Sequence, residues 1–341
     1  MGLNNLKNKK MLKLKTISSL TALLIGVVSP LINTEKAKAA SFSSNSFNIE
    51  TITTGLATPY AVAIDNDDLI VTVDGALIKI DQSGNISTLT SLAPGVPSDA
   101  IVFGSDYVVI EPAEPPAPTS ILRVTPTGDV SEIREIARDP IGFGDPIGLA
   151  IQNQDLIIAD FNRVNNDPFI GDGRLLRYSN QTKNVSVIAS SNLGGAAEVF
   201  VDGENFWVTD FTFGRLLFVT ANGDVKEIAT DLGQPLDIEF DGQYFLITDF
   251  ANGFETPGKG RILRVSKTGQ VETLLSDIGN PSGLAIDGDD LLFTDIVDGR
   301  VARIEGILAT QNVPESSSNT TLIILGVISG YTLLKRESKN N

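Results

Sequence analysis

The chain has 341 residues, of which 42% are hydrophobic and 20% charged, so it is long enough to bury a sizeable core. It contains no cysteine and no histidine, which excludes disulfides, thiol chemistry, Cys or His zinc sites and a Ser-His-Asp triad. Any metal in this protein must be held by oxygen ligands, which favours calcium or magnesium.

The negative charge lies in the middle of the chain. The whole chain has a formal net charge of −16, yet residues 1–40 hold seven lysines and one acid, and residues 313–341 hold three basic and two acidic residues. The stretch between them therefore carries 16 basic and 39 acidic residues, a net charge of −23. Nucleic-acid binding needs Lys and Arg to neutralise phosphates, so we expect no nucleic-acid partner. The negative charge could attract cations or basic partners. The alternative is that it only keeps an exported protein soluble.

Residues 1–39 have the three parts of a secretory signal peptide. Five lysines between residues 7 and 15 precede an apolar run at 17–32, and Ala37-Lys38-Ala39 offers small residues at a cleavage site. This order predicts export, with an uncleaved N-terminal anchor as the alternative.

Residues 40–312 lack long helical periodicity and instead show short Val/Ile/Leu/Phe runs broken by Gly, Asp-Gly, Asn-Gly and Pro, which is typical of strands and turns. Six related units follow one another, which indicates an internal repeat. Their first strands are expected at 60–64, 98–102, 147–151, 197–201, 236–240 and 282–286.

The later strands of each unit begin and end at recurring residue types. The second strand ends on an acid, at Asp74, Glu111, Asp160, Asp210, Asp249 and Asp295. The third strand often opens with Gly-Arg, as in Gly299-Arg300, and a tight turn leads to the fourth. The acids are spaced 37 to 50 residues apart, which is typical of one four-stranded propeller blade.

The sixth unit lacks a fourth strand, and residues 47–52 resemble the fourth strand of the fifth unit. A closed ring removes unpaired sheet edges if this N-terminal strand completes the last blade. We therefore predict an all-β protein, a six-bladed β-propeller of four-stranded blades, with a β-solenoid or open array as the alternative. The repeats resemble NHL repeats and, more broadly, the gluconolactonase-like six-bladed propellers, over about residues 47–306.

Residues 313–341 have the features of a C-terminal sorting signal. Val313-Pro314-Glu315 precedes a polar stretch, an apolar run at 322–334 and a basic end. This layout resembles the PEP-CTERM sorting signal, although Ser316 replaces the second proline that such signals often carry. The resemblance implies a short C-terminal hydrophobic membrane helix, processing by an exosortase-type enzyme, and a cell-envelope or extracellular location. A plain C-terminal membrane anchor is the alternative.

Three acids break the repeat and are the candidate metal ligands. Where units three and six have Gly148 and Gly283, units two, four and five have Asp99, Glu198 and Asp237. First strands line the channel of a propeller, so these carboxylates are expected to converge there, and a calcium ion would offset their repulsion. Solvation by water without an ion is the alternative.

The gluconolactonase-like enzymes hold a divalent metal with Glu, Asn and Asp from inner strands. Their Asn and Asp stand one position earlier, where this chain has Tyr60, Ser98, Ile147, Ala197, Leu236 and Ser282. Those metal ligands cannot be carried over, and without histidine the usual base of related propeller lactonases and lyases is missing too. Both departures favour a protein that is not an enzyme.

Long connections after the second strands suggest a recognition surface, because they lie on one face of a rigid ring. Drift of surface loops, or aromatic rings that cover the blade interiors, are the alternatives. The predicted binding face comprises Glu111, Phe161, Asp167, Phe169, Phe211, Phe213, Phe250 and Phe254. The leading hypothesis is an exported, non-catalytic propeller that binds a protein, glycan or small molecule there. The alternative is a metal-dependent lactonase or hydrolase with its site at the channel mouth.

Overall fold

The computed structural model describes residues 47–92, 97–111, 120–135, 145–162, 170–251 and 255–308. These residues form strands joined by turns and contain no α-helix, and none of them belongs to a helix that could cross a membrane. The predicted signal peptide and C-terminal sorting segment lie outside the described residues.

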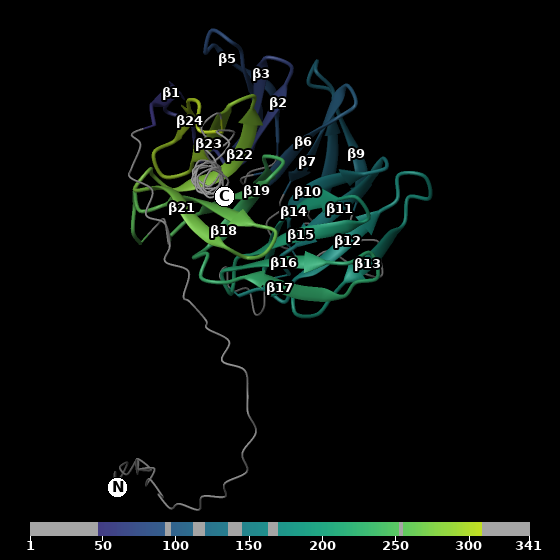
Figure 1. The fold of residues 1–341 in the computed structure, drawn as a ribbon. Coiled ribbons are helices and arrows are strands. Elements are labelled where there is room, and N and C mark those ends of the chain that lie inside the picture. Colours follow the sequence, from purple (N-terminus) through teal and green to yellow (C-terminus); the bar gives the residue numbers. More distant parts are fainter. Residues whose placement is uncertain are drawn as a thin grey trace, which may run out of the picture. The chain divides into compact units, whose positions relative to one another are not determined.

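The strands form six antiparallel four-stranded sheets, the blades of a propeller (Figure 1). We name the strands of each blade a to d from the innermost outward. Blade 1 holds β2 (Val62–Asp65), β3 (Asp68–Val73), β4 (Ala76–Ile80) and β5 (Ile86–Ser91); blade 2 holds β6 (Asp99–Phe103), β7 (Asp106–Glu111), β8 (Ser120–Val124) and β9 (Val130–Glu135); blade 3 holds β10 (Pro146–Gln152), β11 (Asp155–Asp160), β12 (Arg174–Tyr178) and β13 (Val185–Ala189). Blade 4 holds β14 (Ala196–Asp202), β15 (Asn205–Asp210), β16 (Arg215–Val219) and β17 (Val225–Ala229); blade 5 holds β18 (Pro235–Phe240), β19 (Tyr244–Asp249), β20 (Arg261–Ser266) and β21 (Val271–Ser276); blade 6 holds β22 (Pro281–Asp287), β23 (Asp290–Asp295), β24 (Arg300–Ile304) and β1 (Ile49–Thr53).

The ring is closed by the N-terminal strand, as the sequence predicted. β1 pairs with β24, placing Ile49 opposite Ile304 and Thr51 opposite Ala302. The innermost strands contact one another in chain order, and β22 contacts β2 to complete the circle. The prediction of six four-stranded blades is therefore confirmed.

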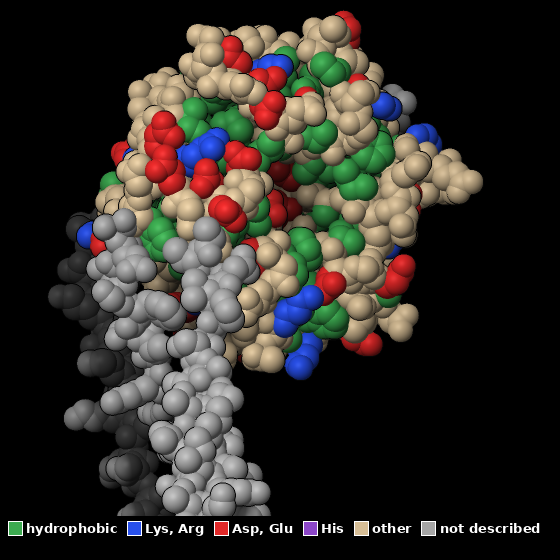
Figure 2. Space-filling model, turned by 45° about the horizontal axis from the view of Figure 1, so that its top comes forward, with side chains coloured by type: hydrophobic (Ala, Val, Ile, Leu, Met, Phe, Trp, Pro, Cys, Tyr) green, Lys and Arg blue, Asp and Glu red, His purple; other side chains and the backbone are tan. Residues whose placement is uncertain are grey.

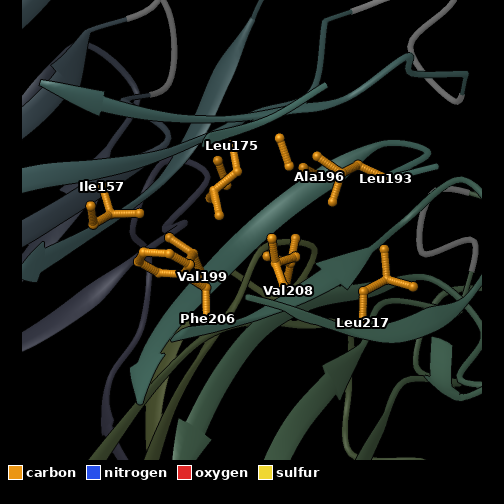
Figure 3. Close-up of a cluster of buried hydrophobic side chains, with 11 residues drawn as sticks. Ile157, Leu175, Leu193, Ala196, Val199, Phe206, Val208 and Leu217 are labelled. Atoms are coloured by element: carbon orange, nitrogen blue, oxygen red, sulfur yellow. The ribbon is translucent and has the colours of Figure 1, made fainter. Parts of the chain in front are cut away.

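Hydrophobic layers between neighbouring blades hold the ring together. The b strands of blades 3 to 6 are buried at every position but the first, while the d strands carry exposed residues at their outer edge. Figure 3 shows one layer, in which Ile157 and Leu175 of blade 3 face Val199, Phe206 and Val208 of blade 4. Such interdigitated packing makes neighbouring blades depend on each other for stability.

The strand directions define two faces of the ring. The b-to-c and d-to-a connections lie at one end of the strands and form the loop face. The a-to-b and c-to-d turns lie at the other end and form the turn face.

The acids that end the b strands are structural in blades 3 to 6. Asp295, for example, is fully buried, accepts the Asn280 N–H at 3.1 Å and pairs with Arg300 Nε at 3.1 Å. The same arrangement recurs at Asp160, Asp210 and Asp249. These four acids therefore hold the hairpin and the blade junction in place. Asp74 was wrongly grouped with them, because β3 ends at Val73 and Asp74 lies in the following turn.

Candidate functional site

The central channel contains the three acids that break the repeat. Asp99, Glu198 and Asp237 each occupy an early position of an innermost strand and line one cavity of about 480 Å³. The cavity is bounded by residues 62–64, 99–102, 149–151, 198–201, 237–239 and 284–286. We call this cavity the funnel and the three residues the floor acids. The predicted convergence of the three side chains on the channel is therefore observed.

Most side chains in the wall of the funnel are aliphatic. From the floor acids the wall runs along the strands toward the turn face, where Ile64, Ile151 and Ile286 are half-buried around the mouth. Figure 2 shows hydrophobic side chains around a central hollow, with acidic side chains deep inside it. The funnel thus combines a mostly aliphatic wall with an acidic floor, as ligand pockets with a few convergent polar groups do.

The floor acids are held by backbone N–H groups of the innermost strands. Asp99 accepts the N–H of Ala100 at 2.7 Å and that of Leu149, in the next blade, at 2.8 Å. Each innermost strand has no strand on its channel side, so its N–H groups there need other acceptors. The carboxylate therefore both fixes its own orientation and links blades 2 and 3.

The same bridge joins blades 5 and 6. Asp237 accepts the N–H of Ile238 and that of Leu284, both at 2.6 Å. Glu198 accepts the N–H of Val199 at 2.9 Å within blade 4. These contacts place the carboxylates in defined positions, which pre-organises the floor for a ligand.

The glycine that replaces an acid in blade 3 makes room for the acid of blade 4. A Cβ atom on Gly148 would lie 2.5 Å from Glu198 Oε1 and 2.5 Å from the Ala197 carbonyl oxygen. Gly283 is equally tight, with the Tyr60 carbonyl oxygen 2.6 Å from its would-be Cβ. Close packing between neighbouring blades therefore requires glycine at both positions.

Burial and mutual repulsion make the funnel carboxyls weak acids. Burial, followed by the charge of Asp237, raises the pKa of Asp99 to about 8. Burial and the neighbouring charges of Asp99 and Asp237 raise the pKa of Glu198 well above its usual value, and burial raises the pKa of Asp237 to about 6. The ring therefore holds protons near neutral pH unless a cation compensates the charge.

A fourth carboxyl, missed in the sequence, lines the same wall. Glu239 lies two residues after Asp237 in β18, so both point to the same side of the strand. Burial and the charge of Asp237 raise the pKa of Glu239 to about 8. The i, i+2 spacing in an innermost strand was the signal that could have revealed it.

The floor acids do not form a ready-made metal shell. Within the described parts of the chain, no group of three or more Asp or Glu side chains lies in a way that could hold a metal ion. The donor atoms are chemically suited to calcium, but they are already engaged by backbone N–H groups. Calcium binding by these residues stays a prediction.

The loop face of the channel is closed by an apolar cluster, which we call the lid. It consists of Phe161, Ala197, Phe211, Leu236, Phe250 and Ile296, with Tyr60 and Ile147 packed against it. Phe161 and Phe211 meet edge to face with ring centroids 6.0 Å apart. Below the lid lies only a cavity of about 10 Å³, bordered by Tyr60 and the floor acids. That volume suits about one water molecule, so among the described residues the larger space beside the floor acids is the funnel on the turn-face side.

Three residues of the predicted binding face belong to the lid. Phe161, Phe211 and Phe250 are 2%, 9% and 5% exposed, so they do not form an aromatic groove for a ligand. Each follows a strand-ending Asp, and its N–H donates to a carbonyl of the preceding d-to-a connection. The three rings pack into the lid. The burial of these rings supports the alternative that they cover the interior of the propeller.

The other residues of that predicted face are scattered or undescribed. Phe213 is 64% exposed at a b-to-c turn, with the Arg215 guanidinium 4.9 Å from its ring centroid. Glu111 ends β7 opposite Ser120. Asp167, Phe169, Phe254 and the sorting residues Val313, Pro314 and Glu315 lie outside the described residues.

A smaller pocket of about 190 Å³ adjoins the funnel on the turn face. Its lining includes Ile286, which also lines the funnel, together with Phe240 and Leu308. Leu308, the last described residue, therefore lies beside the mouth of the funnel.

No protein-family model matches the sequence, and neither does any curated protein. Solved structures do share the fold. A gluconolactonase from Xanthomonas campestris is 13% identical with a TM-score of 0.62, over 76% of this chain and 89% of that one. A luciferin-regenerating enzyme is 16% identical with a TM-score of 0.57, over 75% and 94%.

A third structure extends the same observation. Virginiamycin B lyase from Staphylococcus aureus is 14% identical with a TM-score of 0.52, over 75% of this chain and 98% of that one. The chain is thus a six-bladed propeller with gluconolactonase-like and lyase neighbours. At these identities the likeness establishes the fold alone, because one propeller scaffold supports many activities.

Proposed function

We propose that the protein is an exported, non-catalytic propeller that binds a small ligand in the funnel. The observation that carries this proposal is the convergence of three pre-organised carboxyls at the floor of a cavity closed by the lid. A positively charged group of the ligand would meet the floor acids, and an apolar body would contact the Val and Ile side chains of the wall. The site therefore moves from the loop face, where the sequence suggested it, to the turn face.

The charge of the floor explains the preference for a cation. Carboxylates held close together repel one another, and they either keep protons or accept a positive partner. An organic ammonium group needs fewer, less exactly placed oxygen atoms than a metal ion, so it fits carboxyls that form no metal shell. The wall then supplies affinity through burial of apolar surface.

The chain also carries features of export. The predicted signal peptide and the PEP-CTERM-like segment support a cell-envelope or extracellular location, with an exosortase-type enzyme as the processing partner. We propose that the propeller meets its ligand outside the cytoplasm.

A lactonase-type hydrolase is the second candidate. It is favoured by the raised pKa of Asp99, about 8, which would let this carboxyl donate a proton near neutral pH. Gluconolactonases also share the fold. Against it, the chain has no histidine and does not match the metal-ligand positions of those enzymes.

Calorimetric titration of the purified protein with hexylammonium, an apolar chain with one positive charge, tests the binding proposal. We expect saturable binding that weakens at least about tenfold in Asp237→Asn, since a charged hydrogen-bond acceptor contributes about 1.5–3 kcal/mol. Asp231→Asn, the same change at an exposed loop-face residue, is the matched control. Absence of binding together with turnover of gluconolactone by the same preparation would favour the hydrolase.

A further inference from the structure

Both ends of the propeller chain lie together on the turn face. β1 starts there because it runs as the d strand of blade 6, and β24 ends there as the c strand. Asn48 Nδ2 donates to Glu305 Oε2 at 2.7 Å, and the Glu305 N–H donates to the Asn48 carbonyl oxygen at 3.1 Å. The point where the chain enters the ring is thus tied to the point where it leaves.

The exit is fixed rather than frayed. After β24 the Gly306 N–H donates to Asp290 Oδ1 at 2.7 Å, and the Leu308 N–H donates to the Asp289 carbonyl oxygen at 3.0 Å. Ile307 and Leu308 are 0% and 7% exposed and pack into the hydrophobic cluster of blade 6. Because Leu308 lines the pocket beside the funnel, everything that follows is tethered at the funnel mouth.

The tether to the predicted membrane segment is short. Thirteen residues, 309–321, separate Leu308 from the apolar run that begins at Leu322. Fully extended, such a stretch reaches at most about 50 Å, and as a flexible coil its ends lie about 20 Å apart. The ring itself is about 23 Å deep, the length of a seven-residue strand such as β14.

We propose that the membrane-anchored protein holds its funnel toward the bilayer, with the lid facing away. The fixed exit beside the funnel mouth and the short tether favour this orientation, whereas the opposite one would require the tether to run around the ring. Ligands then reach the funnel through the space between ring and membrane. Processing at the sorting motif would free the mouth for larger ligands. This proposal rests on the predicted C-terminal membrane segment and does not depend on the identity of the ligand.

Energy transfer to labelled lipid tests the orientation. The chain has no cysteine, so Glu204→Cys on the turn face and Thr230→Cys on the loop face each give one labelling site, both exposed and both in blade 4. The chain from residue 40 to residue 341, which lacks the predicted signal peptide, is labelled with a donor dye and reconstituted into phosphatidylcholine vesicles that contain a rhodamine lipid. We expect higher transfer efficiency from residue 204, corresponding to a donor about 20 Å nearer the bilayer.

Two outcomes overturn the proposal. Equal or reversed efficiencies would show that the funnel does not face the membrane, and failure of the chain to float with vesicles would show that the anchor is missing. Insertion of a flexible Gly/Ser stretch of 30 residues after Leu308 serves as the control, because a loose tether should reduce the difference between the two labels. An unchanged difference would contradict the tether as its cause.

Discussion

The two ends of the central channel are built from the same repeat and behave in opposite ways. At the loop face the residue after each strand-ending Asp in blades 3 to 6 is apolar and turns inward, which closes the channel. At the turn face the innermost strands diverge around an apolar funnel whose floor carries carboxyls. Surface loops alone therefore did not locate the candidate site, because burial on one face and access on the other decide where a ligand can enter.

Substitution in the lid should change the free energy of unfolding more than the other substitutions considered below. Phe161→Ala should lower the free energy of unfolding by about 3–5 kcal/mol, because it empties a buried aromatic position. Phe213→Ala, on the same face but exposed, should change it by less than about 0.5 kcal/mol. Denaturant unfolding measures both. Similar effects for the two variants would contradict the closure of the loop face.

A strand-ending acid and a floor acid should also respond differently. Asp295→Asn should cost about 1.5–3 kcal/mol, because the carboxylate accepts backbone N–H groups and pairs with Arg300. Asp237→Asn should cost less at pH 8, because the lost hydrogen bond is offset by the removal of a charge that repels Asp99 and Glu198. A larger loss at Asp237, measured by denaturant unfolding at that pH, would show that the floor acids are purely structural.

The pH dependence of stability tests the raised pKa values of the floor acids. Asp99 has a folded pKa of about 8 against an ordinary 3.8, and Asp237 one of about 6, so the folded state holds protons that the unfolded chain has lost. The stabilisation that these bound protons give the folded state is fully present below about pH 4. It declines as the pH rises toward 8. Thermal unfolding should therefore show a lower Tm at pH 8 than at pH 5, and Glu198→Gln should reduce the difference. A Tm that rises over this range would refute the raised pKa values.

The fold was predictable because each blade repeats the same hydrophobic strands and turn residues. The closing strand followed from the missing fourth strand of blade 6, and the channel position of the floor acids followed from their place in the first strand. The direction of Phe161, Phe211 and Phe250 was not predictable, since it depends on carbonyl groups of a separate connection. Likewise, the engagement of Asp99 by the Leu149 N–H depends on the neighbouring blade, fifty residues away in sequence.

Proton release on ligand binding tests the role of the floor acids most directly. Near pH 7 a cation that binds the floor must displace protons from carboxyls such as Asp99, whose pKa is about 8. Calorimetry with hexylammonium in phosphate and in Tris, which differ in ionisation enthalpy, should give different binding enthalpies, with release approaching one proton per ligand. Equal enthalpies in the two buffers, or binding that is unchanged in Asp237→Asn, would contradict a cation site at the floor of the funnel.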